Sequence, residues 1–68
     1  MEEELKFSTP TTFLGRNGRF KAIGMRISAY GTEVNFTPVT SKNELGRGML
    51  HIPKTDLPEM IRILTSML

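Results

Sequence analysis

The sequence predicts an α+β fold: a four-stranded antiparallel meander sheet (β-β-β-β-α) with one C-terminal helix packed on one face. Two observations predict it. Short runs of alternating apolar and polar residues, separated by turn signals, occupy most of the chain from Leu5 to Ile52, as is typical of strands. The last fourteen residues change to helical spacing of apolar residues. Short connections between successive strands favour antiparallel neighbours.

The first two expected strands form a hairpin. The first strand extends over 5–14, and Pro10 inside it indicates an edge or bulge position. Asn17-Gly18 is predicted to form the hairpin tip, because both residues tolerate positive φ in a type I′ turn. The second strand follows over 19–30.

Side-chain alternation divides the second strand into two faces. One face is aliphatic, and the other carries two aromatic residues around a basic one. The first consists of Ile23, Met25, Ile27 and Ala29, and the second carries Phe20, Arg26 and Tyr30. Arg19 and Lys21 share the aliphatic parity. Either they project beyond the core, or Gly24 marks a bulge that resets the alternation.

Two further strands are expected after a tight turn at Gly31: a third over 33–39 and, beyond a polar loop, a fourth over 46–52. The expected inward residues of these strands, with Phe7 of the first, complete the core. Inward positions are Val34, Phe36, Leu50 and Ile52, and outward positions are Asn35, Thr37, Val39, Arg47, Met49 and His51.

The C-terminal helix has a single apolar stripe, formed by Leu57, Met60, Ile61, Leu64, Met67 and Leu68. Asp56 and Glu59 form an N-terminal capping pattern, with Thr55 as a rival cap. The stripe and the aliphatic sheet face are expected to pack together. Ile63 lies off the stripe, either in contact with a second subunit or as an ordinary exposed apolar residue.

Length limits the chain to one domain over 1–68, with 1–4 expected as a mobile acidic N-terminus. A domain of this size has a thin core, and the lack of cysteine removes disulfides and thiolate metal sites. Small chains without such links gain stability by oligomerising, so a homodimer is expected. Without a run of about 20 apolar residues or a signal peptide, the chain is expected to be cytoplasmic and to have no membrane contact.

Catalysis is not expected. General acid–base chemistry requires titratable groups held close together, and His51 is the single histidine. Neither Gly15-Arg16-Asn17-Gly18 nor Gly46-Arg47-Gly48 has the spacing of a phosphate-binding loop. The chain is therefore predicted to be no enzyme, with no metal, no cofactor and no small-molecule substrate.

The positive signal is a basic, aromatic stretch. All five aromatic residues and eight of the nine basic residues lie between Lys6 and Lys54, where the local charge is near +6. Lys and Arg neutralise phosphates, and aromatic rings stack on unpaired bases. The sequence predicts binding of single-stranded nucleic acid with little sequence preference. The candidate contacts are Arg16, Arg19, Lys21, Arg26, Arg47, Phe20 and Tyr30, with Phe13 as a neighbour across the first hairpin.

The alternative is a protein-interaction or assembly module. Its sheet edge and aliphatic helix would then recruit a protein partner, and the basic face would be incidental.

The segment Gly46-Arg47-Gly48-Met49-Leu50-His51-Ile52, followed by a helix start near Pro53-Lys54, resembles the closing segment of the transcriptional positive cofactor four family. The order of elements is similar to that of the wider group that contains the whirly and Pur-alpha proteins, which has compact bacterial and phage members. The resemblance implies a homodimer that binds single-stranded DNA or RNA on its sheets, a role such as transcription regulation, and a backbone contact for Arg47. The chain departs from the family pattern at Leu57, where an aromatic residue is common, and in the single residue between its glycines.

Overall fold

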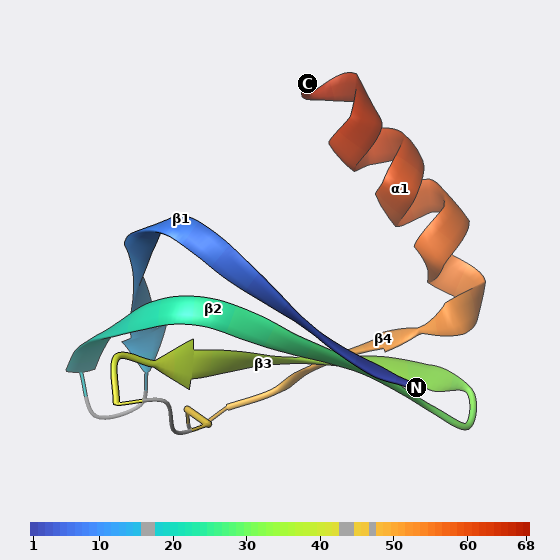
Figure 1. Cartoon of the computed structure of the whole chain (residues 1–68). Helices are drawn as coiled ribbons and strands as arrows, with labels where there is room; N and C mark the ends of the chain where they lie inside the picture. Colours follow the sequence, from blue (N-terminus) through green and yellow to red (C-terminus); the bar gives the residue numbers. More distant parts are fainter. Residues whose placement is uncertain (16–17, 43–44, 47) are drawn as a thin grey trace.

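The computed structural model describes residues 1–15, 18–42, 45–46 and 48–68. Four strands form one antiparallel sheet in the order β1-β2-β3-β4, and a helix follows (Figure 1). The elements are β1 (Glu2–Gly15), β2 (Gly18–Tyr30), β3 (Glu33–Thr40), β4 (Leu50–Pro53), the 3-10 turn η1 (Lys54–Asp56) and α1 (Leu57–Ser66). The predicted fold class and the order of elements are confirmed.

Strand β1 begins earlier than the sequence predicts. Glu2, Glu3 and Glu4 pair with β2 opposite Ser28, Ile27 and Arg26. The sequence predicts a mobile N-terminus over 1–4, whereas in the structure the backbone of Glu2, Glu3 and Glu4 belongs to the sheet. Pro10 lies where the pairing of β1 with β2 shifts register, in agreement with the restriction of proline to edges and bulges.

The β1–β2 and β2–β3 turns lie where the sequence predicts them. Gly15 pairs with Gly18, so Gly18 begins β2, and Asn17 of the predicted tip lies outside the described residues. Gly18 has a φ of +113°, a conformation that glycine adopts without a Cβ penalty. Between β2 and β3, Gly31 has a φ of +53° in the expected tight turn.

A bulge interrupts β2, as one of the two sequence interpretations requires. The register between β2 and β3 shifts between Ala22 and Gly24, which adds one residue to β2 and reverses the alternation beyond it. The β1 backbone also passes very close to this point. A Cβ at Gly24 would lie 2.5 Å from the carbonyl oxygen of Leu5, so only glycine fits there.

Cross-strand partners point to the same face of a sheet, so the register identifies the apolar face. Three rows of paired residues cross it. They are Leu5–Met25–Pro38, Glu3–Ile27–Phe36–Leu50 and Ala29–Val34–Ile52, apolar except for Glu3 at the edge strand. This face agrees with the aliphatic face that the sequence predicts.

The single chain buries little of this apolar surface. Among the described residues the buried apolar side chains are Ala22, Val34, Pro38 and Val39. Leu50 remains 58% exposed although it points to the apolar face. Val39 and Thr37 lie on the face opposite the apolar one, as expected, but both are buried rather than exposed. Bulges increase the local twist of a sheet, so alternation alone does not determine exposure beside the bulge in β2.

Helix α1 forms as predicted but does not pack on the sheet. It projects away from the strands (Figure 1), and within the described residues it packs closely only against η1. The expectation of a helix packed on one sheet face is therefore wrong for the single chain. Turn η1 follows β4 without a linker, and the Lys54 amide donates to the Thr32 carbonyl at 2.9 Å, which fixes where the chain leaves the sheet.

The predicted capping pattern of α1 is partly confirmed. Asp56 occupies the N-cap position and a proline stands in the first turn, but the Asp56 side chain makes no capping hydrogen bond. Glu59 instead accepts a hydrogen bond from Nε of Arg62 at 2.9 Å. Both side chains lie on the polar side of the helix, away from its apolar stripe.

Candidate nucleic-acid interface

The face opposite the apolar one is polar, and the register orders it in rows. These rows are Glu2–Ser28–Asn35–His51, Glu4–Arg26–Thr37, and the pair Tyr30–Glu33. Lys6 lies opposite Gly24 on the same face. Lys6 is not among the contacts that the sequence predicts. The sequence shows that Lys6 alternates with Leu5, but only the strand register shows which residues lie beside Lys6 on the neighbouring strands.

The bulge in β2 brings the remaining described basic candidates to this polar face. Phe20 lies on the apolar face, and alternation places Arg19 and Lys21 on the other side. Because the bulge between Ala22 and Gly24 reverses the alternation, that side is also the side of Arg26. Arg19 and Lys21 are both exposed. Their cross-strand partners are Leu14 and Thr12, near the β1–β2 hairpin end.

Tyr30 and Phe20, predicted to flank Arg26 together, lie on opposite faces. Tyr30 is 75% exposed at the end of β2, where its ring is accessible for stacking. Phe20 is half-buried and belongs to the apolar face. The predicted pairing of these two rings on one surface is wrong, because the bulge lies between them.

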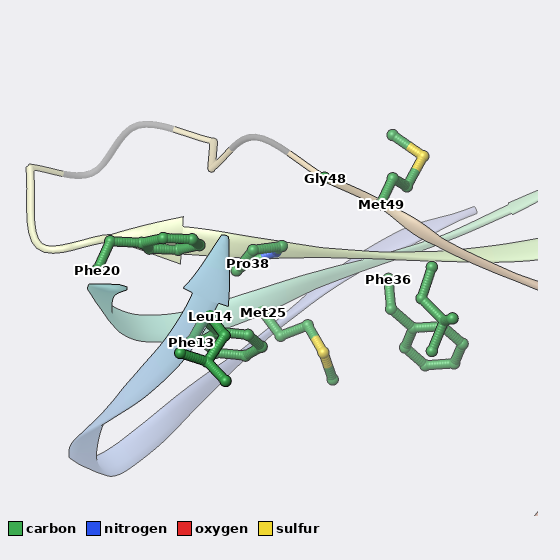
Figure 2. A pocket seen from close by; sticks show the side chains of 9 residues that line it. Phe13, Leu14, Phe20, Met25, Phe36, Pro38, Gly48 and Met49 are labelled. Carbon is green, nitrogen blue, oxygen red and sulfur yellow. The ribbon is translucent and has the colours of Figure 1, made fainter. Parts of the chain in front are cut away.

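Phe20 instead stacks on Phe13 across the first hairpin, with ring centroids 5.8 Å apart. The two residues are direct cross-strand partners, so the predicted approach of Phe13 is confirmed. Their rings border an apolar groove of about 260 Å³ that also includes Met25, Phe36 and Met49 (Figure 2). Met49, which was expected to be outward, is 50% exposed and also borders the groove.

Charge is unevenly distributed on the polar face. Arg26 forms an ion pair with Glu2, with 3.3 Å between Nε and Oε1, and both side chains are substantially exposed at 40% and 59%. Glu4 is the direct cross-strand partner of Arg26. The acids therefore cluster at the end where β1 begins, and Arg19 and Lys21 lie at the hairpin end. The sequence does not predict the Glu2–Arg26 contact, because Glu2 was expected in a mobile segment.

His51 takes part in a cross-strand contact. Its Nδ1 lies 2.6 Å from Oδ1 of Asn35 and 3.2 Å from Oε2 of Glu33. Both neighbours are acceptors, so Nδ1 acts as the donor. Within the described ranges, no group of three or more His, Cys, Asp or Glu side chains could hold a metal ion.

Two of the predicted contacts, Arg16 and Arg47, lie outside the described residues. Five remain: Arg19, Lys21, Arg26 and Tyr30, which share the polar face, and Phe20, which does not. The described part of the chain contains no helix that is long and apolar enough to span a membrane.

No protein-family model, curated protein or solved structure matches this chain. The resemblance to the positive cofactor four group therefore remains a prediction from the sequence.

Proposed function

We propose that this protein binds single-stranded nucleic acid as a homodimer, through the polar face of its sheet. The observation that supports the proposal is that one face of the sheet carries four basic side chains and an exposed aromatic ring. Lys6, Arg19, Lys21 and Arg26 share the face with Tyr30. The basic groups would neutralise phosphates, and the Tyr30 ring would stack on a base.

A flexible single strand suits this surface better than duplex DNA. Duplex recognition in the major groove usually inserts a helix or a two-stranded ribbon. Arg62 is the only basic residue of α1, and it pairs with Glu59. A sheet face, in contrast, accepts splayed bases and an irregular backbone, and stacking on an aromatic ring tolerates any base. This mode of binding would have little sequence preference and would accept DNA or RNA.

The test is a titration of labelled oligo-dT by fluorescence anisotropy at several salt concentrations. Four phosphate contacts to a single strand predict a slope of about −3 for log K against log salt. A matched duplex should bind more weakly at each salt concentration. An affinity for oligo-dT that does not change with salt would exclude the electrostatic mechanism.

A second candidate is a protein-interaction or assembly module, which the exposed apolar side chains of the sheet and of α1 favour. In this case the basic face would be incidental. A gel shift with single-stranded and duplex oligonucleotides separates the two candidates, since the module would shift neither.

A further inference from the structure

Two apolar surfaces in the described part of the chain do not meet. One is the groove on the sheet, bordered by Phe13, Phe20 and Met49. The other is the stripe of α1, where Ile61 is 60% exposed and Leu64 is 52% exposed. An amphipathic helix gains most of its stability by packing its apolar side on a partner. A ten-residue helix that projects into water lacks that contribution.

The exposed area gives the size of the missing contact. The chain exposes 5669 Å², whereas a compact monomer of 7.7 kDa is expected to expose about 4,300 Å². The excess is about 1,300 Å² per chain. Two copies that covered this excess would bury about 2,600 Å² in total, which is within the range of obligate homodimers. The excess area therefore matches what a second copy would cover.

The positions of the two surfaces favour contact between copies over contact within one chain. Met49 and Phe20 place much of the groove toward the β1–β2 hairpin end of the sheet. Helix α1 leaves from the other end of β4, where Pro53 pairs with Glu33, and Figure 1 shows it directed away from the strands. With η1 joining β4 directly to α1, no linker is present to carry the helix back over its own groove.

We propose that α1 of a second copy lies across the apolar sheet face, with Ile61 and Leu64 over the groove. The proposal rests on the homodimer in the proposed function and specifies its interface. A two-fold axis would repeat the contact, so each helix would cover the groove of the other chain. Among the described residues, the side chains that line the groove and those that form the stripe are uncharged, so a contact confined to them would bury no unpaired charge.

This arrangement would leave the polar faces of both sheets accessible. Arg26 and Tyr30 lie on the face opposite the groove, so the interface would not cover them. The Glu59–Arg62 pair lies on the polar side of α1 and would remain in solvent.

The test uses cysteines, since the chain has none of its own. Two single variants, Met49→Cys and Leu64→Cys, are purified in reduced form, mixed and mildly oxidised. A disulfide-linked heterodimer is expected to form faster in this mixture than in a mixture of Met49→Cys with Ser66→Cys. Ser66 is the matched control, because it lies on the polar side of the same helix. Mass spectrometry identifies the linked peptides.

Each outcome supports or overturns the proposal. Selective Met49–Leu64 linkage between chains supports it. A dimeric mass by light scattering with equal linkage of the Leu64→Cys and Ser66→Cys variants overturns this interface and leaves the homodimer intact. A monomeric mass at all concentrations overturns both the proposed interface and the homodimer. Salt-dependent oligo-dT binding, measured on the same unmodified protein, reports separately on the nucleic-acid function.

A second measurement avoids cysteine chemistry. Leu64→Asn should raise the dimer dissociation constant about tenfold or more, because the leucine would leave a buried site. Thr65→Asn, one residue along, should change it little. If Leu64→Asn leaves the dissociation constant unchanged, Leu64 is as exposed in solution as in the single chain and the proposal is wrong.

Discussion

Phe13 and Phe20 stack across the β1–β2 hairpin with their ring planes 13° apart. The stack borders the groove on the apolar face, and Pro38 lies beside it (Figure 2). Phe20 also faces the loop before β4, since a Cβ at Gly46 would lie 3.2 Å from its ring. Phe20 thus packs against β1, β3 and the loop before β4. This position indicates a role in packing rather than in contact with nucleic acid.

Phe20→Ala should therefore destabilise the fold. Loss of a packed phenylalanine lowers the free energy of unfolding by about 3 kcal/mol, and urea denaturation measures it. Phe20→Leu is the matched control and should retain more of the stability. If the Phe20→Ala variant retains full stability but loses oligo-dT binding, Phe20 contacts nucleic acid and does not stabilise the fold.

Tyr30→Ala should give the opposite pattern. The ring is 75% exposed, so its removal should leave the urea midpoint nearly unchanged. Loss of a stacked base should weaken oligo-dT binding by about 1–3 kcal/mol. Tyr30→Phe keeps the ring and should bind almost normally. A Tyr30→Ala protein that unfolds would place the ring in a buried contact.

Glu2→Gln should tighten oligo-dT binding. Glu2 holds Arg26 in an ion pair on the polar face, and its loss would free that guanidinium for phosphate. Exposed ion pairs contribute about 0–1 kcal/mol, so the folded state should change little in stability. Anisotropy titration at low salt measures the change in affinity.

Glu3→Gln is the control for this prediction. It makes the same change in net charge one residue away, but Glu3 pairs with Ile27 and so points to the apolar face. Equal gains in affinity from both variants would mean that net charge acts alone and the Glu2–Arg26 contact does not matter.

Lys21→Gln should reduce the salt dependence of binding. Removal of one phosphate contact lowers the slope of log K against log salt by about 0.7. Lys54→Gln has the same charge change on η1, beyond the sheet, and should leave the slope unchanged. A slope that responds equally to both variants would contradict a defined path for the nucleic acid.

Gly24→Ala should destabilise the sheet by about 1–3 kcal/mol, the usual range for overpacking. The new Cβ would meet the Leu5 carbonyl oxygen, which is backbone and cannot turn aside. Thermal unfolding followed by circular dichroism tests it. An unchanged midpoint would show that β1 does not approach β2 this closely.

The sequence alone determined the four strands, the helix and their order, because these depend on local signals. Alternation in β2, glycine at the β2–β3 turn and helical spacing after Pro53 all act within a few residues. The same local alternation also separated Tyr30 from Ile27 correctly.

Tertiary structure decided which residues share a surface. A one-residue bulge between Ala22 and Gly24 reverses the alternation of β2, which moves Phe20 to the apolar face and places Arg19 and Lys21 on the same face as Arg26. The alternation of residues in the sequence left the bulge as one of two alternatives, because the position of the bulge depends on how β2 pairs with β3. The direction of α1 likewise depends on how η1 leaves β4. An apolar stripe predicts that the helix is covered, but it does not specify which chain covers it.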